Sequence, residues 1–257
     1  MRSKVGAGEE ASERVDMQRK SSIGLSQNQI KLIATAAMVL DHVGMELFPQ
    51  WTILRIIGRL AFPVFSYCIW EGSRRTHHPW QYLLRLFGMG LLCVAGYYAY
   101  TRTFYGNILI TFSLSLCALY AFQYGRTCWT QGKTAARLTG SCVMLGCVGG
   151  IWLICHWVTI DYGFLGVLLP LFAELTVCIW ERCAGMGCKQ ERVGLLGFSL
   201  GLLALSLQIG GIQIFSLLTI PLLLIYNGTR GERNLKQFFY WFYPVHLLLI
   251  GLVSMWI

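Results

Sequence analysis

Two apolar stretches near the start of the chain decide its fold: LIATAAMVLDHVG, residues 32–44, and LRIIGRLAFPVF, residues 54–65. Both are apolar enough to be membrane helices, yet they contain Asp41, His42, Arg55 and Arg59. An ionisable group near the centre of a membrane helix costs about 2.5–3.5 kcal/mol on insertion scales. Four such groups so close together must pair with one another or line a wet cavity, and we expect the functional site here.

The whole chain has the composition of a membrane protein with many helical spans. Of its 257 residues, 55% are hydrophobic and only 13% are charged, where soluble proteins have about 25% charged residues. The mean hydropathy is +0.55. Apolar runs of about 16–22 residues recur without the alternation that the strands of a membrane barrel show. The sequence therefore predicts an all-α, polytopic transmembrane bundle in the lipid bilayer of the inner, or cytoplasmic, membrane.

The net charge of +9 does not indicate a nucleic-acid partner, because the basic residues lie in short loops between the apolar runs. Most of the ten cysteines lie inside apolar runs, where a thiol behaves as a small hydrophobe. We expect all ten to be structural.

The chain divides into a polar tail and a membrane domain. Residues 1–27 have the composition of a disordered cytoplasmic tail, and residues 28–257 form the transmembrane domain. We expect nine spans, near 29–48, 51–71, 82–100, 106–123, 138–159, 162–180, 193–208, 212–226 and 237–256. The stretch 193–226 is about 50 Å long as a helix, too long for one crossing. A break at Gly210-Gly211 makes two short spans, and a re-entrant hairpin is the alternative.

The basic residues predict the orientation. With the N-terminus in the cytoplasm, nearly all loop Lys and Arg residues fall on the cytoplasmic side, and the opposite loops hold little beyond Arg102. This one-sided distribution is the pattern that orients membrane proteins. It places the C-terminus outside.

Helical rise places the polar residues of the first two spans at one depth. His42 lies about 20 Å along its span, and Arg59 lies about 12 Å below the outer surface. The short connection Pro49-Gln50 makes these helices antiparallel neighbours, so Asp41, His42 and Arg59 can meet. Arg55 lies one turn further out, and Gly58 and Pro63 predict a kink in the second span.

This set of residues can perform catalysis. A neutral imidazole can act as a general base or as a nucleophile that carries an acyl group. A carboxylate can fix its tautomer, and an arginine can bind an anion or an oxyanion. Adjacent helical residues point about 100° apart, so Asp41 pairs either with His42 or with Arg59. The structural alternative is a buried Asp41–Arg59 ion pair that ties two helices together.

Two further polar clusters lie near the same helices. The segment after the second span holds Arg74, Arg75, His78 and Arg85 at the cytoplasmic face. These side chains suit a phosphorylated cofactor or, equally, lipid phosphates. We expect no metal there, because acidic or cysteine ligands are lacking nearby. The last span holds Tyr243 and His246 around Pro244, and His246 lies about 14 Å into the membrane, within reach of the His42 level.

Five motifs in order along residues 28–256 resemble one known family. They are QIKLIATAAMVLDHVG from Gln29, LRIIGRLAFPVFSYCIWEG from Leu54, RTHHPWQYLLRL from Arg75, DYGFLGVLLPL from Asp161 and FYWFYPVHLLLI from Phe239. The chain resembles the TraX family of F-pilin N-acetylase-like proteins, within the wider acyltransferase-3-like membrane enzymes. The Asp-His pair followed by Ile-Gly-Arg-Leu-Ala-Phe-Pro is the most specific match.

The resemblance implies a membrane acyltransferase that uses acetyl-CoA and acetylates a pilin-like amine or an envelope or glycan acceptor. It implies that His42 is the catalytic base or acyl carrier, that Arg59 is its partner arginine, and that the basic cytoplasmic face binds the donor. Two other classes remain open: a transporter or flippase that uses the buried charges, and a non-catalytic pilus or envelope assembly factor.

Overall fold

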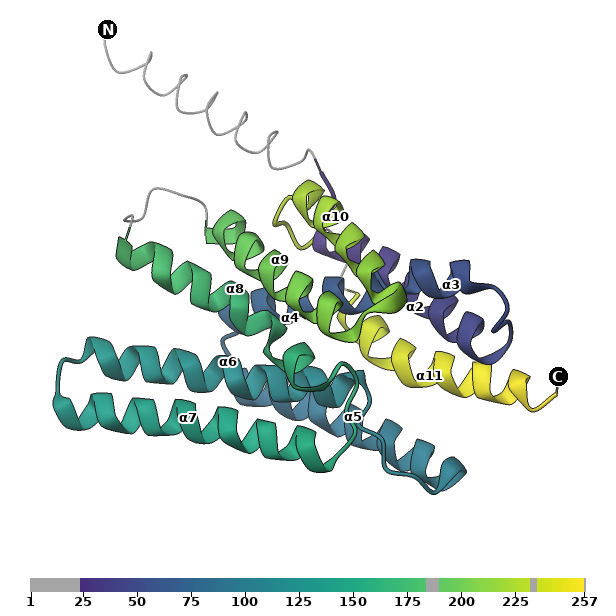
Figure 1. Ribbon diagram of the computed structural model, residues 1–257, viewed down its shortest axis with the longest axis horizontal. Helices are drawn as coiled ribbons and strands as arrows, with labels where there is room; N and C mark the ends of the chain where they lie inside the picture. Colours follow the sequence, from purple (N-terminus) through teal and green to yellow (C-terminus); the bar gives the residue numbers. More distant parts are fainter. Residues whose placement is uncertain (1–23, 184–189, 232–234, 257) are drawn as a thin grey trace, which may run out of the picture.

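The helices run between two ends of an elongated bundle, shown in Figure 1 as a computed structural model that describes residues 24–183, 190–231 and 235–256. The turn between α6 and α7 lies at the left of this view, and the α2–α3 turn and the C-terminal end lie at the right. The helices are α2 (Gln27–Glu46), α3 (Thr52–Gly58), α4 (Ala61–Arg75), α5 (Pro79–Thr101), α6 (Ile108–Thr130), α7 (Thr134–Trp157), α8 (Gly163–Cys183), α9 (Gln190–Ile209), the 3₁₀ helix η1 (Gly211–Leu218), α10 (Thr219–Ile225) and α11 (Lys236–Ser254). All regular elements of the described residues are helical, as the composition predicts.

The two ends of the bundle differ in charge. One end, which we call the basic end, holds the described residues Arg74, Arg126, Lys133, Arg182 and Arg230. The other, the far end, holds the α2–α3 and α5–α6 connections and the C-terminal end of α11. The side that the sequence assigns to the cytoplasm is the basic end.

Seven helices of the described part are long and apolar enough to cross a membrane. They correspond to seven of the nine predicted spans, with α3 and α4 together forming one of them. The remaining two predicted spans are helical but do not meet this measure. Helix α2 is less apolar because of its polar side chains, Asp41 and His42 among them, and the segment Gly211–Ile225 is shorter.

The segment after Gly210 crosses back beside α9. Gly210 and Gly211 have φ values of 71° and 55°, and they reverse the chain where α9 ends. A 3₁₀ helix rises about 2.0 Å per residue, against 1.5 Å in an α-helix. Gly211–Ile225 therefore extends about 26 Å. The carbonyl of Ile225 accepts a hydrogen bond from Leu25 N at 3.1 Å, so the segment returns to the end where α2 begins, as two separate spans require.

The second span is broken in its middle, as predicted from Gly58 and Pro63. Helix α3 ends at Gly58 and α4 begins at Ala61. Pro63 has no N–H group to donate to the carbonyl of Arg59, which interrupts the helical hydrogen bonds at this point. The break places Arg59 between two helices, next to α2.

The start of α2 is fixed by residues that the composition assigns to the tail. Ser26 and Gln29 form a capping box, in which Gln29 N donates to Ser26 Oγ and Ser26 N donates to Gln29 Oε1. Gln27 N also donates to Thr229 O at 2.7 Å. Residues 24–27 thus belong to the folded domain. The rest of the predicted tail, residues 1–23, lies outside the described residues.

Helix α4 lies at the centre of the core. Its side chains Val64, Tyr67 and Trp70 are buried against residues of α2, α6, α8 and α9, such as Ile30 and Phe198. Helix α7 lies on the outside of the bundle (Figure 1) and packs mainly against α6. The core therefore surrounds α4, and the polar residues at both ends of α3–α4 are held by a packed scaffold.

Candidate functional site

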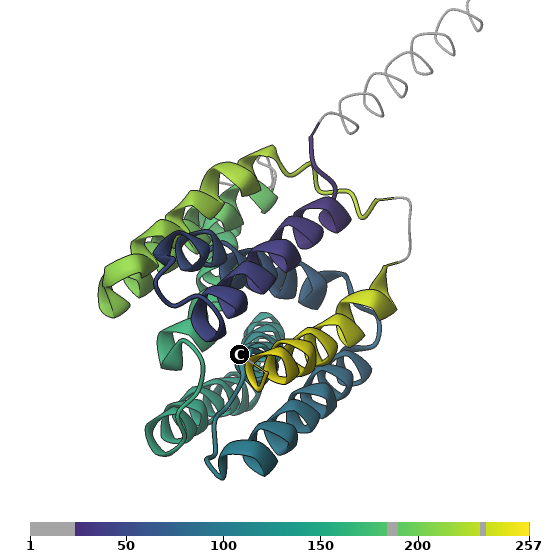
Figure 2. The same ribbon diagram turned by 90° about the vertical axis from the view of Figure 1, so that its right-hand side faces the viewer.

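A cavity of about 1670 Å³ runs along α2 between the two ends of the bundle. Residues of α2, α3, α4, α5 and α11 line it, with Asp161, Tyr162 and Gln213 from other elements. Figure 2 looks at the molecule from the far end, and α2, α5 and α11 lie around the same central region. Most of the residues predicted to form the site line this cavity, including Asp41, His42 and Arg59.

Asp41 forms ion pairs with Arg55 of α3 and with Arg59, which directly follows α3. Arg59 Nη2 donates to Asp41 Oδ2, and Arg55 Nε lies 3.3 Å from Asp41 Oδ1. Gly58 allows this approach, because a Cβ built there would lie 2.6 Å from Asp41 Cγ. The prediction that Asp41 and Arg59 meet is confirmed. Of the two partners predicted for Asp41, the structure selects Arg59, and Arg55 joins the pair.

Arg59 is fixed by three acceptors. Besides Asp41, its Nε donates to Arg55 O at 3.3 Å and its Nη1 donates to Gln213 Oε1 at 3.3 Å. Gln213 is buried, with 2% of its surface exposed, and comes from η1. Arg55 and Arg59 share the Asp41 carboxylate, so the two guanidinium groups keep N–H donors that this carboxylate does not use. Such an arrangement binds an anionic group or a developing oxyanion.

His42 contacts His246 rather than Asp41. His42 Nδ1 lies 2.9 Å from His246 Nε2, and the two rings stack with centroids 5.0 Å apart. The prediction that His246 reaches the His42 level is confirmed. Tyr243, one turn before His246, packs edge-on against the His246 ring and lines the cavity.

The hydrogen bonds of His246 determine the tautomers of both rings when they are neutral. His246 Nδ1 lies 2.9 Å from the carbonyl oxygen of Phe242. A carbonyl only accepts, so Nδ1 carries the proton and His246 Nε2 is an acceptor. His42 Nδ1 must then donate to it, which leaves the lone pair on His42 Nε2. Among the described residues Nε2 of His42 has no hydrogen-bond partner, so this atom is available to a ligand. We call Asp41, His42, Arg55, Arg59 and His246 the His42 cluster.

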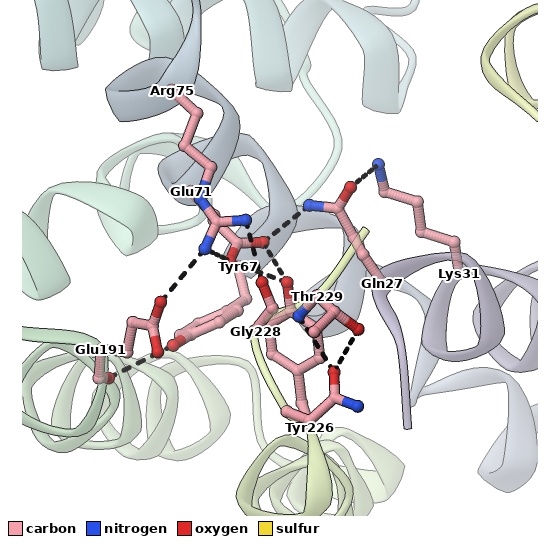
Figure 3. A network of polar contacts seen from close by, with 10 residues as sticks. Gln27, Lys31, Tyr67, Glu71, Arg75, Glu191, Tyr226, Gly228 and Thr229 are labelled. Carbon is pink, nitrogen blue, oxygen red and sulfur yellow. Dashed lines mark hydrogen bonds and ion pairs between the residues drawn. The ribbon is translucent and has the colours of Figure 1, made fainter. Parts of the chain in front are cut away.

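A second polar group, shown in Figure 3, lies at the basic end. The Glu71 carboxylate is 4% exposed and accepts hydrogen bonds from Gln27 Nε2 at 2.6 Å and from Tyr226 Oη at 2.7 Å. Arg75 Nη2 lies 2.8 Å from Glu71 and 3.1 Å from Glu191. These contacts join α2, α4, α9 and the segment after α10. Burial, and next the Glu71 carboxylate, raise the pKa of Tyr226, so its hydroxyl remains a donor. We call Gln27, Glu71, Arg75, Glu191 and Tyr226 the Glu71 network.

The predicted donor-binding residues separate into two groups. Arg75, His78 and Arg85 line the cavity near its basic end, together with Lys31 and His77. Arg74 does not line it: its Nη1 lies 3.2 Å from Glu174 and its Nη2 donates to Gln190. The acidic residues that line the cavity are Asp41, Glu46 and Asp161, all toward the far end. The mouth at the basic end is therefore cationic.

Asp161 lies in the turn between α7 and α8 and forms part of the cavity wall. Tyr105 Oη donates to its carboxylate. Burial raises the pKa of Asp161, while the bond from Tyr105 and the charge of Arg59 oppose that shift. The sequence predicts that Asp161 is an exposed turn residue or a helix cap; the structure places it in the turn, but half-buried beside the site.

Some residues of the site were not predicted. Gln213 could have been noticed in the sequence, because it is a polar amide inside an apolar run. The direction in which its side chain points depends on the 3₁₀ geometry of η1. Tyr105 and Tyr162 were not predicted either. Tyr162 stacks on Phe62 with centroids 3.8 Å apart and thereby supports the wall next to Arg59.

The cysteines and histidines form no metal-like cluster in the part of the chain that the structure describes. Nine cysteines are described there, and each is a free thiol. Cys188 lies outside the described residues. The prediction that the cysteines are structural remains a prediction.

Comparisons with known proteins agree on one family. The family model described as TraX protein matches residues 26–254. Protein TraX of Escherichia coli is 25% identical over 237 residues, which cover 88% of this chain and 86% of that protein. An uncharacterized protein of Rickettsia prowazekii is 32% identical over 145 residues, which cover 56% of this chain and 53% of that protein.

A third relative has a name that refers to pili. The "Probable fimbrial assembly protein FimC, serogroup H1" of Dichelobacter nodosus is 25% identical over 270 residues, which cover 92% of this chain and 98% of that protein. No solved structure matches the chain.

Proposed function

Because the chain belongs to the TraX family, we propose that it is a membrane acyltransferase that moves an acetyl group from acetyl-CoA to an acceptor amine or hydroxyl. The observation that carries this proposal is Nε2 of His42, which has no hydrogen-bond partner in the part of the chain that the structure describes. His246 holds the opposite side of the ring at 2.9 Å, and His42 lines a cavity that Arg55 and Arg59 line as well. A base, an anion-binding group and room for a substrate occur together.

The reaction follows from the tautomer of His42. Nε2 takes a proton from the acceptor as the acceptor's nitrogen or oxygen attacks the carbonyl carbon of the thioester. The new carbon–nitrogen or carbon–oxygen bond forms, and the carbon–sulfur bond then breaks. The proton on Nε2 passes to the sulfur that leaves, so His42 returns to its starting state. While Nε2 holds the proton the ring is an imidazolium, and His246 Nε2 accepts a hydrogen bond from it.

The arginines stabilise the charge that develops during this step. When the acceptor attacks, the carbonyl oxygen of the thioester becomes an oxyanion. Arg55 has 33% of its side chain exposed and Arg59 has 12%, so Arg55 is the more accessible donor. Arg59 is held by Asp41 and Gln213. A donor that is positioned before the reaction requires no reorganisation when the charge appears.

The cationic mouth suits the phosphates of the donor. Lys31, Arg85 and His78 line the cavity at the basic end, and phosphate oxygens accept charge-assisted hydrogen bonds from such groups. Lys31 and His42 both lie on α2, about 16 Å apart along the helix. A donor bound at the mouth must therefore carry its acyl group on an extended arm to reach His42, as acetyl-CoA does.

The acceptor is proposed from the names of the relatives. The fimbrial relative favours a pilus subunit or another envelope component as the acceptor, and the cytoplasmic membrane as the location. The same name also favours a second function, a non-catalytic factor in pilus assembly. In that case the His42 cluster would tie α2, α3 and α11 together without chemistry.

The test is labelled-acetyl transfer by the purified full-length protein in nanodiscs, with and without a cell extract as the source of acceptor. We expect wild type to release CoA and to label an acceptor. His42→Ala should lower this rate by about 10²–10⁴-fold, the usual contribution of a general base. His156→Ala is the matched control, because His156 is exposed on α7 and stacks only on neighbouring tryptophans.

Three results would contradict the proposal. Transfer by His42→Ala at the wild-type rate would remove the catalytic role of His42. Complete absence of acetyl transfer from the wild-type protein, in extracts that contain pilus subunits, would favour the assembly factor. Transport of a solute across the membrane of liposomes that contain the protein, without any release of CoA, would favour a transporter or flippase.

A further inference from the structure

A second groove lies on the outside of the bundle, away from the central cavity. It has a volume of about 400 Å³ and is formed by α6, α7 and α8. Both α7 and α8 pack against α6, on opposite sides of it in Figure 1. They make few contacts with each other, so α6 forms the floor of the groove.

The groove has a charged mouth at the basic end. Arg126 is four residues from the end of α6, and Arg182 is next to the last residue of α8. Arg126 forms an ion pair with Glu181. Arg182 is exposed and has no hydrogen-bond or ion-pair partner among the described residues. Trp129 also lines the groove. The guanidinium carbon of Arg137 lies 5.8 Å from the centroid of the Trp129 ring. Three guanidinium groups and one carboxylate give this mouth a positive charge.

The deeper part of the groove is apolar. Leu145, Leu175 and Ile179 line it, and their side chains are 74%, 37% and 61% exposed. Leu175 lies about 10 Å further into the bundle than Arg182 at helical rise. Trp129 stands at the mouth, where membrane proteins place tryptophan at the level of the lipid headgroups. The groove is thus positively charged and aromatic at its mouth and apolar further inside.

We propose that this groove is a binding site for an anionic phospholipid, with the phosphate at Arg126 and Arg182 and one acyl chain along Leu145, Leu175 and Ile179. The positive mouth selects a headgroup with net negative charge over a zwitterionic one. The groove selects a lipid over a free phosphate, because only a lipid fills its apolar part. This site is independent of the acyl transfer proposed above.

The test is native mass spectrometry of the full-length protein released from detergent, after titration with dioleoyl phosphatidylglycerol or dioleoyl phosphatidylcholine. We expect wild type to retain one phosphatidylglycerol at least fivefold more than phosphatidylcholine. Arg182→Gln should remove most of this preference. Arg182 is exposed and has no partner among the described residues, so we expect its replacement to leave the fold intact. Arg192→Gln is the matched control, since Arg192 is an exposed arginine at the same end that does not line the groove.

A second variant tests the apolar part. Leu175→Trp fills the groove without changing any charge, and it should lower retention of phosphatidylglycerol as much as Arg182→Gln does. Equal retention of the two lipids by wild type would overturn the proposal. So would an unchanged preference in both variants, or an equal loss in Arg192→Gln, which would indicate binding to the whole basic surface.

Discussion

The His42 cluster and the Glu71 network are both groups of ionisable side chains buried between helices, yet they are built in opposite ways. In the Glu71 network one carboxylate receives hydrogen bonds from Gln27, Tyr226 and Arg75. Here one arginine is shared by two carboxylates, because Glu191 pairs with Arg75 as well. In the His42 cluster two arginines share one carboxylate, and Nε2 of His42 has no hydrogen-bond partner within the described ranges.

This difference separates a structural role from a chemical one. Buried polar groups that satisfy one another stabilise a fold, since each lost partner leaves a costly unsatisfied group. A site that acts on a ligand must keep some hydrogen-bonding capacity unused. Burial and charge alone do not distinguish the two regions; the hydrogen-bonding capacity that remains unused in each of them does.

The largest expected effect on stability belongs to the Glu71 network. Glu71→Ala removes the acceptor of three side chains and should destabilise the protein by about 3 kcal/mol. Its acetyl-transfer rate per folded molecule should stay near wild type. Glu191→Ala is the matched control, because Glu191 pairs with the same arginine from an exposed position. It should cost less than about 1 kcal/mol.

The midpoint of unfolding in SDS measures both variants. If Glu191→Ala destabilised the protein as much as Glu71→Ala, the contrast between a buried and an exposed partner would be wrong. If Glu71→Ala abolished transfer while unfolding normally, the network would belong to the catalytic site.

The next effect concerns the residue that orients His42. His246→Ala leaves His42 Nδ1 without its acceptor, so the ring is free to take the other tautomer. We expect the transfer rate to fall about 10–100-fold, a part of the contribution of the base itself, with little change in stability. His246→Gln should recover much of the activity, because an amide oxygen can accept from Nδ1.

The pH dependence of the acetyl-transfer rate tests whether His246 acts through His42. Wild type and His246→Gln should share the shape of their profile, and His246→Ala should change it. A changed profile in Asp41→Asn together with an unchanged one in His246→Ala would show that Asp41, after all, orients the imidazole.

The sequence was sufficient to predict which residues share a depth. Helical rise is constant, and a short connection leaves little freedom, so Asp41 had to lie near the level of Arg59. Helical rise also predicted that His246 lies at the depth of His42. The rotation of each helix about its own axis was not predictable. Asp41 and His42 point in different directions, and only packing decided that Asp41 faces α3 while His42 faces α11.

Adjacent arginines illustrate the same limit. Arg74 and Arg75 appeared equivalent as donor-binding groups, but Arg74 turns to Glu174 and Arg75 turns to Glu71. The position of the Gln213 side chain could not be predicted for another reason. Its direction depends on η1 being a 3₁₀ helix with three residues per turn, and the apolar run around it also suits an ordinary α-helix.

The smallest expected effect tests the cavity wall beside the His42 cluster, at Asp161. Burial raises the pKa of Asp161 above its ordinary value of 3.8, so the folded protein holds this proton to a higher pH than the unfolded chain does. Stability from this group is therefore lost as the pH rises above about 4. Asp161→Asn has no proton to lose. The midpoint of thermal unfolding of wild type, relative to this variant, should fall with rising pH and then level off. Tyr105→Phe removes the hydroxyl that donates to the carboxylate, so its midpoint should fall over a wider range of pH. A wild-type midpoint that rises relative to Asp161→Asn would mean that Arg59 outweighs burial, and that Asp161 belongs with Asp41 as a partner of the arginines.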